Sequence, residues 1–468
     1  MRKTKIICTI GPASSDMKIL KQMADIGFDA VRLNFSHGDH DSHRKIIKYI
    51  NEVKKLVKRK PALLLDTQGP EIRTGKLKEE ISLKAGDIFT FSVKDKYDEE
   101  FGTTINYKEL AKYIKKNDRL LVDDGLIEFK VKDIKGDEIV CKVLNSGVLG
   151  SNKTVNLPNI DVKMPSLTEK DIEDIDFGII HNIDFIAVSF VKTKEDVIEL
   201  RNYLKKKNED IQIISKIEHQ KAVDNFDEIL EVSDGIMVAR GDLGVEIPFE
   251  RVPMVQGQII KKCNKAGKSV IVATHMLNSM IENPRPTRAE ASDVATAVYE
   301  GADAVMLSGE TAKGKYPLES LNVLDRLCVE TERTMHCRMD KYKDEKPVTA
   351  KHIVSNSVAL CAEKLNAKAI IALTVTGKTA GLICRYKLKK PIFVFSPLEK
   401  IQDETKLHFG AFSYSIDIKN KTPGELIEES ITVLKEEKHI KPKDIVIITV
   451  ALMSGKEPDN FVEVKVVE

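Results

Sequence analysis

Short apolar runs recur along the chain, and most are followed by a segment in which apolar residues have helical spacing. Runs that are apolar on both faces are typical of parallel strands in a sheet covered on both sides. Eight strand–helix units in succession predict an α/β fold built on a closed (β/α)8 barrel, with an open doubly wound sheet as the alternative. The predicted strands are 5–10, 30–34, 62–66, 185–190, 212–218, 235–240, 270–274 and 304–308.

The pattern changes between the third and fourth of these strands. Apolar and charged residues alternate there, most clearly at 127–132, and the sequence KGDE at 135–138 predicts a hairpin turn. We therefore expect a small antiparallel β domain at 70–165, inserted into a barrel domain formed by residues 1–69 and 166–340.

A polar segment at 339–347 predicts a linker. Helical patterns and strands alternate again beyond it, which indicates a carboxyl-terminal α/β domain at 347–468. The strands predicted in this domain are 369–375, 391–397, 444–450 and 461–467.

Composition narrows the class of protein. Lysine and arginine total 74 against 72 aspartate and glutamate, and the basic residues are dispersed, so neither a nucleic-acid nor a membrane surface is indicated. No apolar run is long enough to cross a bilayer, and no export signal is visible. The seven cysteines lack CxxC spacing, which is typical of reduced thiols in a cytoplasmic protein.

Polar side chains follow most of the predicted barrel strands. In a barrel with only a structural role, apolar or neutral turn residues would be expected at these positions. The active site of a (β/α)8-barrel enzyme lies at the carboxyl ends of its strands. A salt bridge or a helix cap can explain any one of these residues, but not six strand ends together. The residues are Arg32, Asn34, Asp66, Thr67, Lys216, Glu218, Arg240, Asp242, Thr274, Ser308 and Glu310.

Two carboxylates and a lysine stand out in this set. Lys216 and Glu218 are two residues apart on one predicted strand, so they share a face. Mg²⁺ binds a few carboxylates and keeps water or substrate oxygens, which suits Glu218 with Asp242. Lys216 would then hold an anionic phosphoryl or enolate oxygen beside the metal. The pattern indicates phosphoryl transfer or enolate chemistry.

Further residues offer binding groups near the same strand ends. Arg32 and Arg73 can clamp phosphate. His37 is a candidate general base, with a hydrogen-bonding loop histidine as the structural alternative. The glycines of ARGDLG, Gly241 among them, let backbone amides approach a carboxylate. Mostly neutral oxygens with a single charge favour a monovalent cation, and this second set comprises Asn34, Ser36, Asp66 and Thr67.

Long motifs in this chain resemble those of the pyruvate kinase family. They are CTIGPAS (8–14), RLNFSHG (32–38), DTQGPEIRTG (66–75), KIE (216–218), GIMVARGDLGVEIP (235–248), PRPTRAE (284–290) and MLSGETAKGKYP (306–317). The resemblance implies a homotetramer of chains that each combine the barrel, an inserted β-barrel lid and a carboxyl-terminal α/β domain. It also implies phosphoryl transfer from phosphoenolpyruvate to ADP in glycolysis, giving pyruvate and ATP, with Mg²⁺ (or Mn²⁺) and K⁺.

The resemblance implies a role for each matching residue. Lys216, Thr274, Arg32 and Arg73 form the expected catalytic set, and Glu218 and Asp242 would bind Mg²⁺. The implied substrate contacts are Arg32, Lys216, Gly241, Asp242 and Thr274, and the implied nucleotide contacts are Arg73, Asn34 and His37. The implied K⁺ contacts are Asn34, Ser36, Asp66 and Thr67. Ser308 and Glu310 would form a proton relay.

Some residues of this chain bear on how the protein would be regulated, and three others differ from those usual in the family. Glu71 stands where potassium-dependent members carry glutamate, which implies activation by K⁺. Gln68, His219 and His275 depart from the family's usual residues without removing a proposed ligand. The loop TVTGKT resembles one that cradles a sugar phosphate in regulated members, so a sugar-phosphate or nucleotide effector is expected at Thr374, Thr376, Gly377, Lys378 and Thr379.

Two other functions are compatible with the residues. A metal-dependent aldolase acting on the pyruvate enolate would also use a glutamate–aspartate pair on a barrel. A catalytically silent metabolite sensor could be built on the same scaffold, although Lys216, Glu218 and Asp242 are intact. Turnover of phosphoenolpyruvate and ADP distinguishes both from a kinase.

Overall fold

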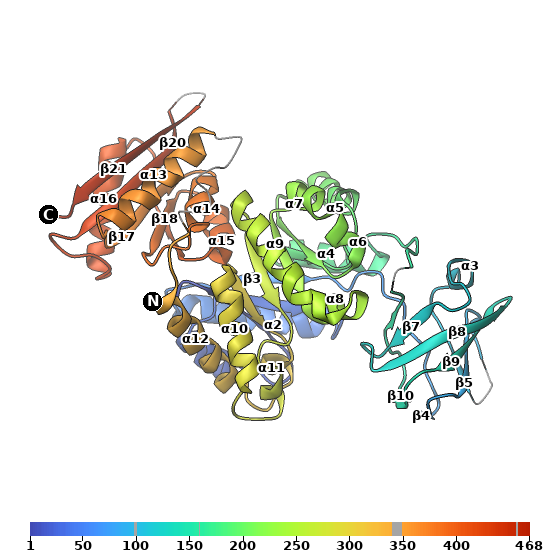
Figure 1. Ribbon diagram of the computed structural model, residues 1–468. Coiled ribbons are helices and arrows are strands. Elements are labelled where there is room, and N and C mark those ends of the chain that lie inside the picture. Colours follow the sequence, from blue (N-terminus) through green and yellow to red (C-terminus); the bar gives the residue numbers. More distant parts are fainter. Residues whose placement is uncertain (98–100, 159, 339–348, 455–456) are drawn as a thin grey trace.

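The computed structural model describes the chain except residues 98–100, 159, 339–348 and 455–456, so the predicted linker lies outside the described residues. Eight parallel strands close into a barrel in the order β1-β16-β15-β14-β13-β12-β3-β2 (Figure 1). The predicted barrel is therefore confirmed, and the open sheet is not formed. The strands are β1 (Lys5–Thr9), β2 (Ala30–Asn34), β3 (Ala62–Asp66), β12 (Phe185–Val188), β13 (Gln212–Ile217), β14 (Gly235–Ala239), β15 (Ser269–Ala273) and β16 (Ala304–Leu307).

Helices cover the outside of the barrel, and local signals fix their ends. For example, Thr287 and Glu290 exchange hydrogen bonds in a capping box at the start of one helix, which ends at Gly301 with a φ of 94°. The helices are α1 (Met17–Ile26), α2 (His40–Leu56), α4 (Glu169–Ile180), α5 (Lys194–Lys206), α6 (Gln220–Asp224), α7 (Phe226–Val232), α8 (Arg240–Glu246), α9 (Val252–Ala266), α10 (Arg288–Glu300), α11 (Gly309–Ala312) and α12 (Pro317–Thr334).

The inserted region packs around its own core, in which Phe89, Phe91 and Phe129 contact one another. Its six-stranded sheet has the order β11-β7-β8-β9-β5-β6, beside a two-stranded sheet of β10 and β4. The expected antiparallel pairing holds except between β5 and β6, which are parallel. The elements are β4 (Ile81–Leu83), β5 (Ile88–Ser92), β6 (Gly102–Thr104), α3 (Leu110–Tyr113), β7 (Arg119–Val122), β8 (Ile127–Lys135), β9 (Glu138–Val143), β10 (Gly147–Leu149) and β11 (Val155–Asn156).

The carboxyl-terminal region forms a five-stranded sheet in the order β19-β18-β17-β20-β21, and only β21 runs antiparallel to its neighbour. The edge strand β19 is absent from the sequence-based expectation, because its serines interrupt the apolar run. The elements are α13 (Ala350–Lys364), β17 (Ala369–Thr374), α14 (Lys378–Cys384), β18 (Ile392–Ser396), α15 (Glu399–Glu404), β19 (Ala411–Ser415), α16 (Pro423–Glu436), β20 (Ile445–Ser454) and β21 (Glu457–Val466).

The barrel lies between the inserted sheet and the carboxyl-terminal sheet (Figure 1). A buried ion pair joins the barrel to the carboxyl-terminal region: Lys387 Nζ lies 2.6 Å from Asp303 Oδ1, and the two side chains are 0% and 3% exposed. The backbone amide of Phe409 donates to the same oxygen at 2.9 Å. Asp303 precedes β16, so this contact is at the end of the barrel opposite the carboxyl ends of the strands.

Replacing Lys387 with methionine is expected to lower the free energy of unfolding by about 3–5 kcal/mol, because Asp303 would remain buried without its cation. Lys421→Met is the matched control, since its pair with Glu429 is partly exposed and should contribute no more than about 1 kcal/mol. Thermal unfolding of both variants measures the difference. Equal losses of stability would contradict a special role for the buried pair.

Candidate active site at the carboxyl ends of the barrel strands

Lys216 is the centre of a buried polar network. Its Nζ lies 2.9 Å from Asp66 Oδ1, 2.9 Å from Glu218 Oε1 and 2.7 Å from Ser189 Oγ. Burial lowers the pKa of Lys216, but the two carboxylates outweigh burial and the net shift is upward. The lysine is therefore held as a cation. Ser189 was absent from the expected set, because a serine after a strand carries no signal of its own.

Arg32 shares the carboxylate of Asp66 with this lysine. Arg32 Nε lies 2.5 Å from Asp66 Oδ2, and its Nη1 donates to Thr9 Oγ1 at 3.1 Å. Burial raises the pKa of Asp66, but Arg32 and Lys216 outweigh it and the net shift is downward. Asp66 is thus an ionised group that fixes two cations at one side of the barrel mouth.

Glu218 and Asp242 carry the negative charge of the mouth. Glu218 Oε2 accepts a hydrogen bond from the amide of Phe190 at 2.7 Å. Burial raises the pKa of Glu218 to about 7, and Asp242 adds to the rise while Lys216 opposes it. Burial also raises the pKa of Asp242. Both groups therefore favour a nearby positive charge.

The donor set around these carboxylates is incomplete for a metal held by protein alone. Among the described residues, no three side chains of histidine, cysteine, aspartate or glutamate gather closely enough to hold an ion. Two carboxylates with open coordination positions are the arrangement in which Mg²⁺ keeps water or substrate oxygens. Glu218 and Asp242 therefore fit a divalent cation that binds together with an anionic substrate.

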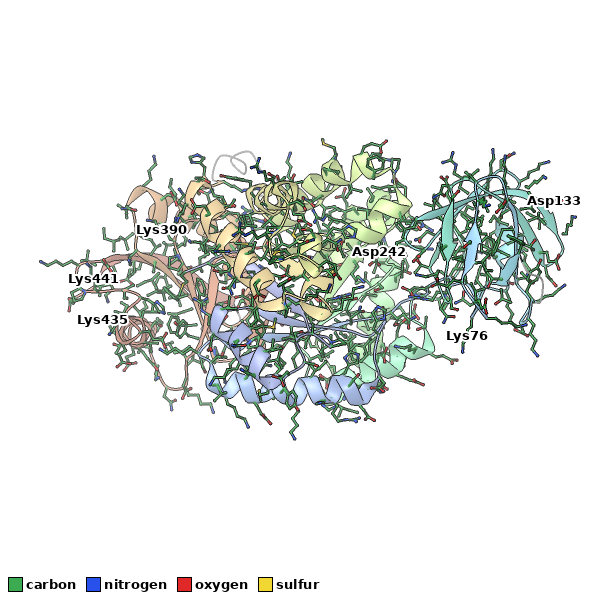
Figure 2. All side chains as sticks on the ribbon, turned by 90° about the horizontal axis from the view of Figure 1, so that it is seen from below. Lys76, Asp133, Asp242, Lys390, Lys435 and Lys441 are labelled. Atoms are coloured by element: carbon green, nitrogen blue, oxygen red, sulfur yellow. The ribbon has the colours of Figure 1, made fainter. Side chains whose placement is uncertain are left out.

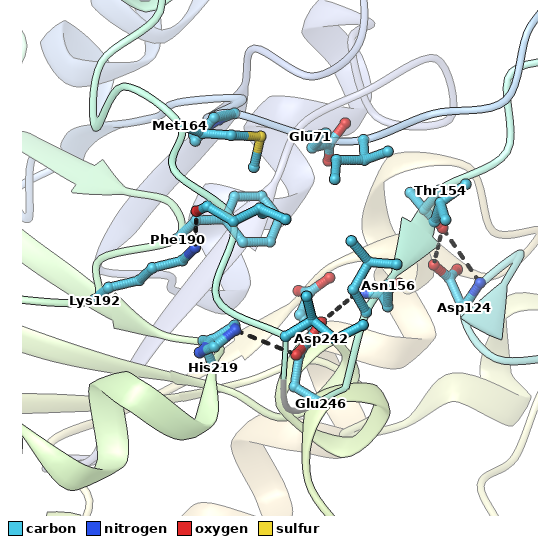
Figure 3. A pocket seen from close by; sticks show the side chains of 16 residues that line it. Glu71, Asp124, Thr154, Asn156, Met164, Phe190, Lys192, His219, Asp242 and Glu246 are labelled. Carbon is cyan, nitrogen blue, oxygen red and sulfur yellow. Dashed lines mark hydrogen bonds and ion pairs between the residues drawn. The ribbon is translucent and has the colours of Figure 1, made fainter. Parts of the chain in front are cut away.

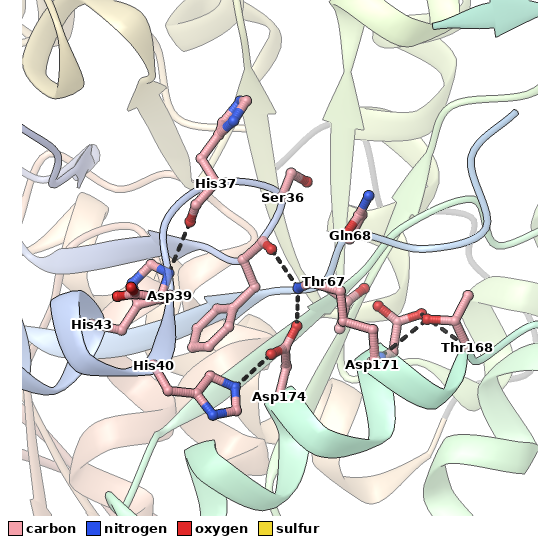
Figure 4. Close-up of polar contacts among 12 residues, drawn as sticks. Ser36, His37, Asp39, His40, His43, Thr67, Gln68, Thr168, Asp171 and Asp174 are labelled. Carbon is pink, nitrogen blue, oxygen red and sulfur yellow. Dashed lines mark hydrogen bonds and ion pairs between the residues drawn. The ribbon is translucent and has the colours of Figure 1, made fainter. Parts of the chain in front are cut away.

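The residues expected to hold a monovalent cation lie on the ends of β2 and β3. The two strands pair in a register that places Asn34 opposite Asp66. Asn34 Oδ1 accepts from the amide of Ser36 at 3.2 Å, and Thr67 Oγ1 accepts from the amide of Ser189 at 3.1 Å. Figure 4 shows Ser36 and Thr67 on adjoining loops. The structure brings this set to one side of the mouth.

Thr274 and Gly241, both expected to contact substrate, contact each other. The amide of Gly241 donates to Thr274 Oγ1 at 2.8 Å, and Thr274 has a left-handed φ of 63°. Arg240 Nη1 binds Asp293 at 2.7 Å, and its Nη2 donates to the carbonyl of Thr274 at 2.7 Å. Arg240 therefore supports the backbone of the mouth and is not available as an anion clamp.

Ser308 and Glu310 lie at the end of β16. Glu310 is buried, and its two carboxylate oxygens accept from the amides of Leu277 and Ser308 at 3.0 and 2.8 Å. Ser308 Oγ is buried, and no hydrogen-bond partner for it is present among the described residues. Glu310 thus anchors both the loop after β15 and the residue that follows β16.

Arg73 and His37 lie on the side of the mouth nearest the inserted sheet. Arg73 Nη2 pairs with Glu71 at 2.6 Å, and its Nη1 donates to the carbonyl of Asn152 at 2.8 Å. Burial, with Arg73 and then Arg32, lowers the pKa of His37. The two arginines thus disfavour the protonated form of His37, and Arg73 is itself paired with Glu71.

A pocket between the inserted sheet and the barrel opens beside Asp242 (Figure 3). Asn156 Nδ2 donates to Glu246 Oε1 at 2.9 Å, and His219 Nε2 lies 3.5 Å from the other oxygen of the same carboxylate. Lys221 pairs with Asp161 at 2.8 Å. These contacts join the two regions next to the mouth, and neither Asn156 nor Glu246 was expected from the sequence.

The expected effector loop is less open than its sequence indicates. Thr374 is fully buried, and its Oγ1 accepts from the amides of Thr376 and Gly377 at 3.3 and 3.1 Å. Thr379 is also buried. The hydroxyl of Thr374 is used by the turn itself, so Thr376 and Lys378 are the exposed groups of this loop.

The fold is a (β/α)8 barrel, and the ends of its strands hold a buried lysine among carboxylates. Together, this fold and this site define the chain as a phosphotransferase. The family model described as pyruvate kinase, barrel domain, matches residues 1–321, and that described as pyruvate kinase, alpha/beta domain, matches residues 352–465. The chain belongs to the pyruvate kinase family.

Individual relatives agree with this assignment. A pyruvate kinase of Clostridium perfringens is 48% identical over 93% of this chain and 93% of its own length. One of Clostridium acetobutylicum is 42% identical over the full length of both chains. The crystal structure of a pyruvate kinase from Cryptosporidium parvum superposes with a TM-score of 0.94 at 39% identity, covering 100% of this chain and 96% of that one. No helix among the described residues is long and apolar enough to cross a membrane.

Proposed function

We propose that this protein is a Mg²⁺-dependent, K⁺-activated pyruvate kinase that transfers phosphoryl from phosphoenolpyruvate to ADP in glycolysis. The observation that carries the proposal is the position of Lys216 Nζ, 2.9 Å from carboxylates of both Asp66 and Glu218 at the mouth of the barrel. A cation fixed there can meet a phosphoryl group whose metal is held by Glu218 and Asp242.

The carboxylates of Glu218 and Asp242 would hold the divalent cation, because burial raises both pKa values and a cation would offset that effect. When bound, Mg²⁺ (or Mn²⁺) neutralises charge on the phosphoryl oxygens. Lys216 donates hydrogen bonds to the same group, and Arg32 holds a second phosphate oxygen. Gly241 and Thr274 border the space for the substrate carboxylate.

In the proposed reaction, the bond between phosphorus and the enol oxygen of phosphoenolpyruvate breaks, and a terminal oxygen of ADP bonds to phosphorus. Lys216 stabilises the developing enolate oxygen. The enolate carbon then takes up a proton and becomes the methyl group of pyruvate. Thr274 and Ser308 are proposed to guide that proton, with the backbone amide of Ser308 held by Glu310.

ADP is proposed to bind between the barrel mouth and the inserted β-barrel lid, where Arg73, His37 and Asn34 lie. Arg73 lies at the start of the lid range and donates to the carbonyl of Asn152 within it. A lid that closes over the nucleotide would exclude water and so prevent hydrolysis of the phosphoryl donor.

Activation by K⁺ is proposed to occur at Asn34, Ser36, Asp66 and Thr67, whose oxygens include one carboxylate that two cations already neutralise in part. Replacing K⁺ with tetramethylammonium is expected to lower kcat by about tenfold or more, because the positive charge beside the phosphoryl site would be lost. Steady-state kinetics at constant ionic strength measure the effect.

Glu71→Lys tests the same site with a fixed charge. Glu71 and Asp242 line the same pocket, so a lysine at position 71 would supply positive charge there without K⁺. We expect its activity to be nearly independent of K⁺, whereas Glu79→Lys on the exposed surface of the lid should keep the parent's dependence. Equal dependence in both variants would contradict the proposal.

Assembly, location and regulation are proposed from family membership. The chain is proposed to be a cytoplasmic homotetramer that binds no nucleic acid and no membrane. A sugar phosphate or nucleotide is proposed to bind at Thr376 and Lys378, the exposed groups of the effector loop. The domain boundaries at 1–69, 70–165, 166–340 and 347–468 remain proposals of the same kind.

A coupled assay of pyruvate release tests the proposed function. Purified protein is supplied with phosphoenolpyruvate, ADP, Mg²⁺ and K⁺, and pyruvate formation is followed through lactate dehydrogenase. Turnover that requires ADP supports a kinase. Absence of turnover would contradict the kinase, and absence of nucleotide binding would favour the aldolase alternative.

A further inference from the structure

An open cleft of about 720 Å³ lies where β17, β18 and β20 begin. It is at the opposite end of this sheet from the effector loop, which follows β17. Its apolar lining includes Ala367, Pro391 and Ile445. Its charged lining is six lysines and one aspartate, namely Lys3, Lys368, Lys389, Lys390, Lys438, Lys443 and Asp444. We refer to it as the lysine cleft.

This concentration of positive charge is a local departure, because the whole chain has 74 basic and 72 acidic residues. Of the six lysines, only Lys3 has a carboxylate partner among the described residues, Glu332 at 3.6 Å. Lys389 donates to the carbonyl of Arg333 at 2.9 Å, and Lys390 donates to the amide oxygen of Asn366. Positive charge in the cleft is therefore poorly compensated by the protein.

The one aspartate in the lining supplies a single negative charge against six lysines. Asp444 Oδ2 accepts from the backbone amide of Lys441 at 2.9 Å, which fixes this carboxylate to the turn before β20. Like charges gathered in one depression repel one another, and a multivalent anion would relieve that repulsion.

The position of a helix end explains the presence of one of the lysines in the lysine cleft. Lys368 lies four residues beyond the end of α13 and directly precedes β17. Lys438 follows the carboxyl end of α16, where a lysine interacts favourably with the helix dipole. That reason does not apply to Lys389 and Lys390, which precede β18, or to Lys443, which precedes β20. Lys3 comes from a different part of the chain altogether, just before β1 of the barrel.

We propose that the lysine cleft binds a small anion that carries two or more phosphate groups. Lysine ammonium groups act as point charges toward phosphate, so several of them around one space favour several phosphates. A cleft of about 720 Å³ has the size of a small-molecule site, and its apolar lining can accept the uncharged part of the molecule.

Such a ligand would connect the barrel to the carboxyl-terminal sheet. The amide of Lys3 donates to Glu332 of α12 at 2.9 Å, and its carbonyl accepts from the amide of Gly410 at 2.9 Å. A molecule held by Lys3 and by Lys390 or Lys443 would therefore span both regions. Binding there does not depend on the proposed phosphoryl transfer.

Inorganic tripolyphosphate is the probe, titrated calorimetrically into the full-length chain at about 0.15 M KCl. The test variant is the double substitution Lys390→Glu with Lys443→Glu. Its matched control, Lys435→Glu with Lys441→Glu, makes the same charge change on the same region but outside the cleft lining (Figure 2). Unchanged melting temperatures establish that each variant is folded.

We expect the parent to bind one tripolyphosphate per chain, the cleft variant to bind at least tenfold more weakly, and the control to stay within twofold of the parent. Equal weakening in both variants would overturn the proposal, because it would indicate attraction to net charge alone. Absence of binding by the parent would also overturn it. Loss of binding in Lys378→Glu, with binding retained in the cleft variant, would assign the anion to the effector loop instead.

Competition identifies the source of the phosphates. A nucleoside triphosphate and a sugar bisphosphate are each titrated against bound tripolyphosphate, and displacement by either supports the proposal and names the class. Displacement only by a 20-nucleotide RNA would overturn it in favour of a nucleic-acid surface. Repeating the titration on Lys216→Met separates this site from catalysis, since its binding should equal that of the parent.

Discussion

Replacing Lys216 with methionine is expected to lower kcat by about 10²- to 10³-fold or more, the cost of removing one fixed charge from the transition state. The ammonium group lies 2.9 Å from both Asp66 and Glu218 and 2.7 Å from Ser189, so no other cation can take its place without rearrangement. Methionine keeps most of the volume of the side chain but supplies no donor. The measurement is steady-state kinetics in the pyruvate-release assay with saturating metal and substrates.

Two controls make that result specific. Lys207→Met removes a partly exposed lysine that pairs with Asp176, and it should leave kcat within about twofold. The melting temperature of Lys216→Met shows whether the active-site network survives, and Arg32 should still hold Asp66. A folded Lys216→Met enzyme with more than a tenth of the parent's kcat would refute the assigned role.

Glu218→Gln and Asp242→Asn are each expected to raise the Mg²⁺ concentration for half-maximal activity by at least about 100-fold, because each removes one of two charged ligands. Glutamine at position 218 can still accept the amide hydrogen bond from Phe190. The loss should therefore concern the metal and not the fold. Activity is measured over a range of Mg²⁺ and Mn²⁺ concentrations at saturating phosphoenolpyruvate.

Glu246→Gln is the matched control for these variants. Glu246 lines the same pocket as Asp242, is buried as Glu218 is, and also has a pKa raised by burial. Its oxygen binds Asn156 of the inserted region, so we place it in the contact with the lid and not in the metal site. A change of less than about threefold in the Mg²⁺ requirement is expected. A shift as large as that of Glu218→Gln would mean that total pocket charge, and not ligation, controls the metal.

Most of the fold could be predicted from hydrophobic patterning, and the failures have physical causes. Six of the eight barrel strands are buried at every position, so their apolar runs are easily recognised. Strand β19 lies at an edge of its sheet and alternates with serine, which weakens that signal. The parallel pairing of β5 with β6 depends on which neighbour each strand meets, and periodicity carries no information about neighbours.

Some residues of the candidate site could also be predicted from the sequence, whereas others could be found only from their contacts. Lys216, Glu218, Asp242 and Asp66 are charged residues at the ends of apolar runs, so the sequence itself marks them as unusual. Ser189 and Asn156 are common polar residues whose importance comes only from what they contact, which are Lys216 and Glu246. Thr374 shows the converse, because it was expected to bind an effector but its hydroxyl is used by its own turn.

The sequence by itself determined that this protein is a barrel with an inserted β region and a carboxyl-terminal α/β region, and that charged residues gather at one mouth. It could do so because the periodicity of strands and helices is a local property of the chain, and eight successive strand–helix units are typical of a closed parallel barrel. Only the tertiary structure decided which charges touch. Lys216 meets Asp66 across 150 residues, Asp303 meets Lys387 across 84, and Lys3 reaches the lysine cleft from the other end of the chain. Such pairings depend on packing in three dimensions, which no local pattern records.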